Sequence, residues 1–165
     1  MFAAANFETI PLSELETKGL LGMPDRHLPL VLVVDDEQII ADTRAAILTG
    51  WGYAVLTAYD AESALEMARV IPPEVLISDV ILTRMNGVDL AIEVKRMAPD
   101  CEVILFTGRT DGHDFIAAAH SAGHDFKLLS KPVHPAQLLT LLRELGLSEA
   151  ADAATHGLPK TTDLN

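Results

Sequence analysis

The feature that most constrains the fold is an alternation of short apolar runs with amphipathic helical patterns between Leu30 and Gly146. This alternation is typical of βαβ units, in which helices connect the strands of a parallel sheet. We therefore predict an α/β domain with a doubly wound five-stranded parallel sheet. The predicted strands are Leu30–Val34, Tyr53–Thr57, Glu74–Ser78, Glu102–Phe106 and Phe126–Leu129.

Four of these runs are almost continuously apolar, as expected for strands that helices cover on both faces. The second run alternates through Tyr53, Val55 and Thr57, which is more typical of an edge strand. Between the strands, apolar residues recur three and four positions apart and give each of five helices one buried face. These stripes are Ile40, Thr43 and Ile47; Ala61, Leu65 and Ala68; Leu90, Val94 and Met97; Phe115, Ala119 and Ala122; and Leu138, Leu142 and Leu145.

The ends of the chain do not follow this pattern, so we divide the sequence into three parts. Residues 1–28 form an N-terminal extension, 29–147 the domain, and 148–165 a small, polar tail that we expect to be disordered. Ser13 and Glu16 have the spacing of a capping box, which predicts a short helix in the extension.

Charge and cysteine content restrict the possible functions. The formal net charge of −12 opposes binding to a phosphate backbone, so we expect no direct DNA binding. The single cysteine, Cys101, excludes an internal disulfide, which fits a reducing compartment. No signal peptide and no run long enough to cross a bilayer are present, so we expect a soluble, cytoplasmic protein.

Acidic residues follow two of the predicted strands. Asp35 and Asp36 come directly after the first strand, and Asp79 follows Ser78 at the end of the third. Taken singly, such residues are usually turn formers or helix caps. Two short βα units separate Asp36 from Asp79, however, and would return the chain to the same edge of the sheet, where ligands of open α/β sheets bind. Three neighbouring carboxylates repel one another unless a cation neutralises them, and oxygen ligands favour Mg²⁺.

Two more polar residues stand at strand ends. Thr107 follows the fourth strand and Lys131 follows the fifth. A capping threonine and a solvent-directed lysine are the commoner explanations of each residue alone. Together at one edge, a hydroxyl and an ammonium are suited to binding the oxygens of a transferred phosphoryl group.

Four stretches of the sequence resemble the receiver domain of bacterial response regulators. They are Val31–Glu37 (VLVVDDE), Ser78–Gly87 (SDVILTRMNG), Leu105–Gly108 (LFTG) and Ser130–Pro132 (SKP). The resemblance covers residues 30–146 and implies a flavodoxin-like sheet of strand order 2-1-3-4-5.

The resemblance also implies roles for individual residues. Asp79 would accept a phosphoryl group from a phosphohistidine of a sensor histidine kinase or a phosphotransfer protein. Asp36 would bind Mg²⁺ directly, Asp35 largely through water, and Ile81 through its backbone carbonyl. The metal set is therefore Asp35, Asp36, Asp79 and Ile81.

In the same way, Thr107 would contact the phosphoryl oxygens and Lys131 would pair with them. Phosphorylation would switch a docking surface made of the fourth helix, fifth strand and fifth helix. No output domain follows the fifth helix, so we expect a stand-alone receiver that acts on an unidentified protein effector. Two positions depart from the family: Leu128 replaces the usual switch aromatic, and Thr83 stands where proline is common.

Two other functions remain open. One is a phosphatase with an aspartyl nucleophile, which requires a second acidic residue two positions after the nucleophile. Ile81 occupies that position and opposes this function. A pseudo-receiver would keep the fold as an interaction module without phosphotransfer, although the five retained site residues oppose this. His120 and His124 have a metal-ligand spacing, but Gly123 interrupts the pair and no further ligand motif accompanies it.

Overall fold

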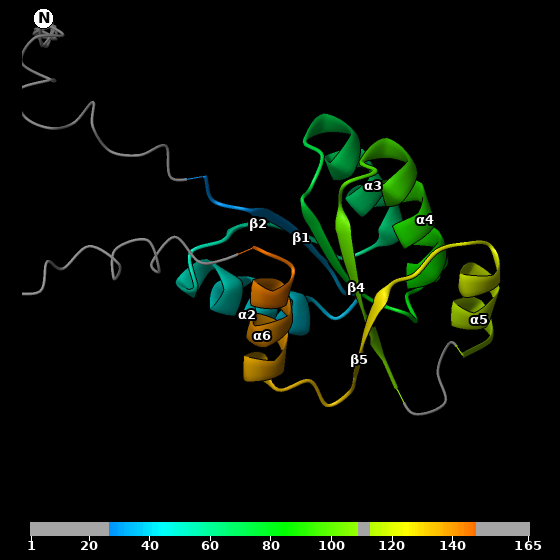
Figure 1. Cartoon of the computed structure of the whole chain (residues 1–165). Helices are drawn as coiled ribbons and strands as arrows, with labels where there is room; N and C mark the ends of the chain where they lie inside the picture. The colour runs from blue at the N-terminus through cyan, green and yellow to red at the C-terminus, as the bar shows by residue number, and fades with distance from the viewer. Residues whose placement is uncertain (1–26, 109–112, 148–165) are drawn as a thin grey trace, which may run out of the picture.

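The structure is a computed structural model that describes residues 27–108 and 113–147. Strands and helices alternate along the chain, each strand being followed by a helix (Figure 1). The strands are β1 (Leu30–Val34), β2 (Ala54–Ala58), β3 (Val75–Asp79), β4 (Glu102–Thr107) and β5 (Lys127–Ser130). The helices are α2 (Gln38–Gly50), α3 (Ala61–Val70), α4 (Gly87–Met97), α5 (His113–Ser121) and α6 (Pro135–Glu144).

The five strands form one parallel sheet with the order β2-β1-β3-β4-β5, which confirms the predicted topology. β1 and β3 are neighbours although a helix, a strand and another helix separate them in the chain. The strand order therefore reverses between β1 and β3. In open α/β sheets, ligands bind outside the carboxyl ends of the strands at such a point.

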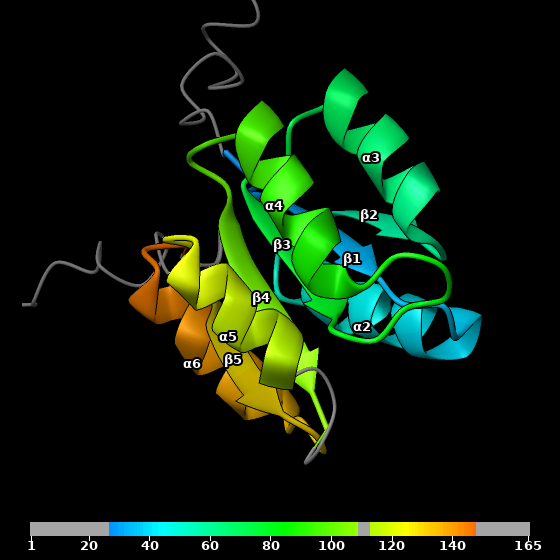
Figure 2. The same cartoon turned by 90° about the vertical axis from the view of Figure 1, so that its right-hand side faces the viewer.

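Helices cover both faces of the sheet. α2 and α6 lie on one face, and α3, α4 and α5 lie on the other (Figures 1 and 2). Each face has its own core, because alternate residues of β1, β3 and β4 point to opposite sides. Leu32, Leu76 and Leu105 belong to the core under α3 and α4. Val33, Ile77 and Ile104 belong to the core under α2 and α6.

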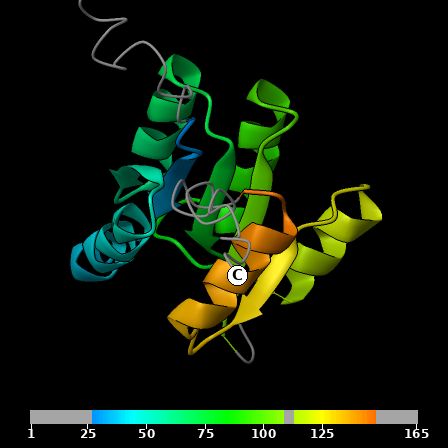
Figure 3. The ribbon, with the colours of Figure 1, turned by 60° about the vertical axis from the view of Figure 1, so that its left-hand side comes forward.

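The edge strand β5 is more exposed than its apolar sequence suggests. We expected helices to cover it on both faces, but three of its four residues are exposed and Leu129 is half-buried. Among the described residues, β5 has only β4 as a neighbouring strand, and α5 beside it contributes a single buried residue, Ala119 (Figure 3). The prediction of a covered fifth strand is therefore wrong, because an apolar run does not reveal how closely a helix packs on it.

The ends of the chain lie outside the described residues. The short helix predicted around Ser13 and Glu16, and the disordered tail predicted for 148–165, both fall there. Within residues 27–108 and 113–147, no helix is long and apolar enough to cross a membrane.

Gly87 holds the loop after β3 against the end of that strand. Its amide donates a hydrogen bond to the Val80 carbonyl at 2.7 Å. A Cβ atom on Gly87 would lie 1.9 Å from the Asp79 carbonyl oxygen and 3.1 Å from the Ser78 hydroxyl oxygen. Only a glycine allows this approach, so α4 begins directly beside the residue that ends β3.

We expect Gly87→Ala to lower the free energy of unfolding by about 1–3 kcal/mol, because the loop must shift away from a backbone atom that cannot yield. The measurement is urea denaturation followed by circular dichroism. Gly50→Ala is the matched control, since a Cβ there meets nothing within 4 Å. At this helical position alanine should stabilise by up to about 1 kcal/mol. Equal stability of Gly87→Ala and the wild-type protein would contradict the assigned contact.

Candidate functional site

The carboxyl ends of four strands bring the predicted site residues to one edge of the sheet. The register pairs Val34 with Ser78, Asp79 with Phe106, and Thr107 with Ser130. Asp35 therefore follows β1 next to the end of β3, and Lys131 follows β5 next to the end of β4. Backbone hydrogen bonds hold these ends in place: the Val80 amide donates to the Phe106 carbonyl at 2.9 Å, and the Lys131 amide donates to the Thr107 carbonyl at 2.8 Å.

Asp79 is a buried carboxylate with two cationic neighbours. Its residue is only 5% exposed. The Lys131 ammonium donates a hydrogen bond to Oδ2, and Nη1 of Arg44 lies 3.4 Å from Oδ1. Burial raises the pKa of Asp79 above its ordinary value, the charge of Asp35 raises it further, and Lys131 and Arg44 partly offset this rise. Loss of hydration is thus the largest influence on the pKa of this carboxylate.

Arg44 joins two of the predicted acidic residues. It extends from α2, donates a hydrogen bond to Oδ2 of Asp35, and reaches Asp79 with the same nitrogen. Its guanidinium carbon lies 4.5 Å from the ring centroid of Phe106, which is the geometry of a cation–π contact. The Asp35 side chain is 1% exposed and that of Arg44 17%, so this ion pair is largely shielded from water.

The sequence interpretation missed Arg44, although a signal for it was present. The residue lies four positions after Ile40 and three before Ile47, within the apolar stripe of the helix. A charge in the buried face of an amphipathic helix requires a partner. Here the partners are the carboxylates at the ends of β1 and β3.

Asp36 points to a different partner. It is exposed, and its Oδ2 accepts a hydrogen bond of 2.8 Å from the Thr83 hydroxyl. Thr83 lies in the loop between β3 and α4, at the position where the family often has proline. The two loops that border the site are thus joined by side chains.

The remaining predicted residues lie at the same edge. Thr107 is buried at the end of β4, and its hydroxyl donates to the Gly108 carbonyl at 3.1 Å. Ile81 lies two residues after Asp79, with a half-exposed side chain. Lys131 precedes Pro132 through a cis peptide bond. The edge therefore presents carboxylates, a hydroxyl and an ammonium together.

The donor chemistry of this edge fits Mg²⁺, because the candidate ligands are carboxylate and carbonyl oxygens. Among the described residues, no three His, Cys, Asp or Glu side chains are grouped closely enough to hold a metal ion. The charges of Asp35 and Asp79 are instead balanced by Arg44 and Lys131.

Comparisons with known proteins agree with this geometry. The family model described as "Response regulator receiver domain" matches residues 31–143, more than half of the chain. The chain belongs to this family. Receiver domains are phosphoacceptor signalling domains of two-component response regulators, and the strand order found here is that of the family.

Individual relatives are similar over the same region. The probable transcriptional regulatory protein TcrX of Mycobacterium tuberculosis is 34% identical over 115 residues, which are 70% of this chain and 48% of the relative. The DNA-binding response regulator MtrA of Mycobacterium leprae is 29% identical over 68% of this chain and 49% of its own length. The chain thus spans about half the length of these curated relatives.

Solved receiver structures superpose on the domain. A CheY-like receiver domain protein from Methanospirillum hungatei has a TM-score of 0.66 at 27% identity, covering 79% of this chain and all of that protein (100%). The chemotaxis protein CheY4 of Vibrio cholerae has a TM-score of 0.64 at 26% identity and covers 72% of this chain and 99% of its own.

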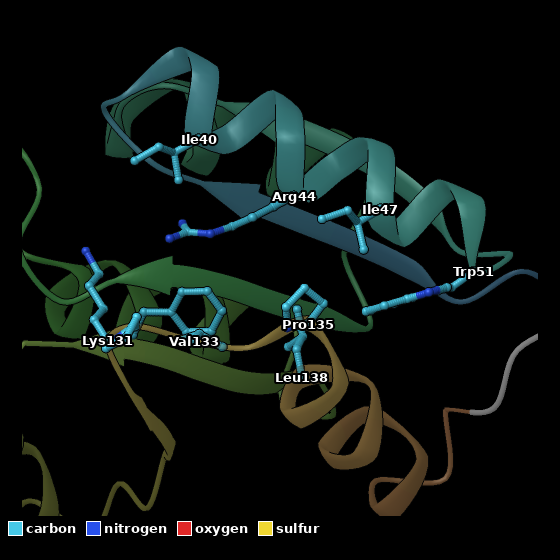
Figure 4. A pocket seen from close by; sticks show the side chains of 10 residues that line it. Ile40, Arg44, Ile47, Trp51, Lys131, Val133, Pro135 and Leu138 are labelled. Carbon is cyan, nitrogen blue, oxygen red and sulfur yellow. The ribbon is translucent and has the colours of Figure 1, made fainter.

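A cavity of about 500 Å³ adjoins the acidic edge of the receiver domain. It lies between α2 and α6, and Figure 4 shows Arg44 extending from α2 toward Lys131 along it, with Ile40 and Ile47 on either side. Trp51 and Leu138 lie toward its far end. The walls are mainly apolar, so the two cations form the polar end of an otherwise hydrophobic space.

The structure does not place His120 and His124 as a pair of metal ligands. The His124 ring stacks on Phe126 with centroids 5.7 Å apart, and Gly123 between the two histidines has a φ of 87°. α5 ends at Ser121, so the two histidines do not lie on one continuous helix. The two residues are four apart in the sequence but are not neighbours on one helical face, as an i, i+4 ligand pair would be.

We expect Asp79→Asn to stabilise the receiver domain at pH 7 in the presence of a chelator. A raised pKa means that the folded state holds the proton of Asp79 more tightly than the unfolded chain does. This tighter proton binding stabilises the folded state at low pH. The stabilisation is lost as the pH rises through the pKa that Asp79 has in the folded state. Asparagine has no charge to bury, so the difference between variant and wild type should shrink toward pH 4, the ordinary carboxyl range.

The measurement is the thermal unfolding midpoint of both proteins between pH 4 and pH 8. Asp100→Asn is the control, because it removes the same charge from an exposed turn. A lower midpoint for Asp79→Asn than for the wild-type protein at pH 7 would show that pairing with Lys131 outweighs the cost of burial.

Proposed function

We propose that Asp79 is the phosphoacceptor of this receiver domain and takes its phosphoryl group from a phosphohistidine of a sensor histidine kinase or a phosphotransfer protein. The observation that carries the proposal is the contact between the Asp79 carboxylate and the Lys131 ammonium at the ends of β3 and β5. A carboxylate held beside a cation, at the edge where the sheet binds ligands, is suited to an anionic group in transfer.

The reaction exchanges one bond to phosphorus for another. A carboxylate oxygen of Asp79 attacks the phosphorus, a P–O bond forms, and the P–N bond to the histidine breaks. The electron pair of the broken P–N bond stays on the departing imidazole nitrogen, and a proton completes the neutral imidazole. Lys131 stays with the developing charge on the phosphoryl oxygens, and Thr107 donates a hydrogen bond to them once its hydroxyl leaves the Gly108 carbonyl.

Asp35, Asp36, Asp79 and the Ile81 carbonyl would hold Mg²⁺ in this proposal. When bound, the ion would neutralise charge shared between the carboxylates and the phosphoryl oxygens. The chain's own residues orient the acceptor: the Gly87 amide and the Phe106 carbonyl fix the backbone next to Asp79.

Phosphorylation would then switch a protein-docking surface made of α5, β5 and α6. Several features support this surface. Leu128 on β5 is 43% exposed and Phe115 on α5 is 45% exposed, although both are large apolar side chains. A hollow of about 460 Å³ also lies between α5 and β5, and Ile116 and Phe126 belong to its walls. Loosely packed apolar surface is what a protein partner would cover.

We also propose that the receiver domain itself makes no direct contact with DNA. MtrA is named a DNA-binding regulator, but this chain spans only about half the length of such relatives. The net charge of −12 opposes a phosphate backbone.

A second candidate function is a pseudo-receiver that acts as an interaction module without phosphorylation. One observation favours it: the acidic residues Asp35 and Asp79 are already neutralised by Arg44 and Lys131. Both carboxylates of such a site have cationic partners without any ligand. A single phosphorylation assay distinguishes the two functions.

We expect incubation with Mg²⁺ and radiolabelled acetyl phosphate to label the wild-type protein at one residue, with an adduct that is acid-stable and base-labile. Asp79→Asn should lose the label completely while keeping its circular dichroism spectrum. Asp100→Asn should be labelled like the wild type, because its carboxylate lies in an exposed turn. Persistent labelling of Asp79→Asn would place the acceptor elsewhere. Absence of both labelling and beryllofluoride binding in the wild type would favour the pseudo-receiver.

A further inference from the structure

We infer that Arg44 is a resident counter-ion of the acidic pocket, and that a divalent cation must displace it toward the cavity between α2 and α6 in order to bind. This inference rests on the proposed function, because it concerns the same carboxylates. It adds a residue that sets the affinity of the site for its cation.

Arg44 occupies the position of a bridging cation. One of its nitrogens, Nη1, contacts Oδ2 of Asp35 and lies 3.4 Å from Oδ1 of Asp79. A metal ion held by these two residues, through water at Asp35 and directly at Asp79, would draw on the same two carboxylates. Guanidinium and metal therefore compete for one set of electron pairs, and both cannot hold them at full strength.

The surroundings of Arg44 favour the guanidinium at this place. Phe106 supplies an aromatic face at 4.5 Å from the guanidinium carbon. The Asp35 side chain is almost fully buried, and its other oxygen, Oδ1, accepts the Glu37 amide at 2.9 Å. Asp35 thus has defined partners on both oxygens before any metal arrives, which makes the exchange costly.

The charge balance points in the same direction. Asp35 and Asp79 are neutralised by Arg44 and Lys131, one cation for each carboxylate. Addition of a divalent ion would leave the pocket with an excess of positive charge unless one side chain moves. Arg44 is suited to move, since its side chain runs along an open cavity.

The cavity gives the guanidinium a destination. Arg44 lines this space of about 500 Å³ together with Ile40 and Ile47 of its own helix and Val133 beyond β5 (Figure 4). The methylene groups of the arginine would pack on these apolar neighbours while the guanidinium turned toward solvent, a behaviour common for long cationic side chains.

The test is Mg²⁺ binding measured by isothermal titration calorimetry on four proteins: wild type, Arg44→Met, Arg44→Lys and Arg96→Met. Arg44→Met should bind Mg²⁺ about tenfold or more tightly than the wild type, because binding no longer breaks a charge-assisted hydrogen bond. Arg44→Lys should lie between them, since lysine keeps the charge but loses the planar guanidinium that packs on Phe106. Arg96→Met removes the same charge from the exposed last turn of α4 and should bind like the wild type.

Stability provides a second measurement that does not depend on phosphorylation. Arg44→Met leaves the buried Asp35 without its cation, so its thermal midpoint in chelator should fall below that of the wild type. Mg²⁺ should raise the midpoint of Arg44→Met by more than that of the wild type, because tighter binding stabilises more. If Arg44→Met fails to fold, NMR of the wild-type protein replaces it. The chemical shift of the Arg44 Nε–H should then change with Mg²⁺ concentration in parallel with Mg²⁺ binding.

The outcomes separate this inference from the proposed function. Equal or weaker Mg²⁺ affinity of Arg44→Met, with binding by both proteins, overturns the displacement and leaves the proposed function in place. An Arg44 resonance that stays unchanged while Mg²⁺ saturates the wild type overturns it as well. Absence of Mg²⁺ binding in both proteins overturns the inference together with the metal part of the proposed function. Binding by Arg44→Met alone supports the inference.

Discussion

The burial of a negative charge at the end of β3 is the constraint on which the site depends. Asp79 is held almost out of water, and burial raises its pKa more than its cationic neighbours lower it. A charge in such a place needs partners of opposite sign that come from other elements. Lys131 after β5 and Arg44 on α2 are these partners, so the ends of the sheet and one helix are joined through a single carboxylate.

The topology explains why such distant residues meet. In the order β2-β1-β3-β4-β5, β3 has β1 on one side and β4 on the other. The helix that follows β1 crosses over the sheet face that α6 also covers, and this brings Arg44 over Phe106. Gly87 closes the opposite side by allowing α4 to begin against the Asp79 carbonyl. The site is therefore a consequence of strand order together with one close backbone contact.

Much of this arrangement could be predicted from the sequence, because the period of apolar residues and the punctuation by glycine and proline are local signals. The sheet order was expected from the family resemblance, and the placement of Asp35, Asp79, Thr107 and Lys131 at strand ends followed from the topology. The position of Arg44 in an apolar stripe indicates that it has a partner, but the partners themselves could not be predicted, since the direction of a long side chain depends on which strands lie under its helix. The bond between Asp36 and Thr83 joins two loops whose relative position is a tertiary property. The exposure of β5 was missed for the same reason, because it depends on how closely α5 packs.

The charge pattern connects the acidic edge to both sides of the domain. Lys131 bonds to Asp79, follows β5 directly, and lines the cavity between α2 and α6. A phosphoryl group on Asp79 would place close to two negative charges within reach of this ammonium, where the free carboxylate has one. Lys131 would then turn from one carboxylate oxygen to the new anion. This movement would alter both the end of β5, which precedes Lys131, and the wall of the cavity that Lys131 lines. A displaced Arg44 would alter the same wall from the opposite side. The face formed by α2 and α6 would therefore respond to the state of Asp79 together with the face formed by α5, β5 and α6, because one lysine belongs to the borders of both.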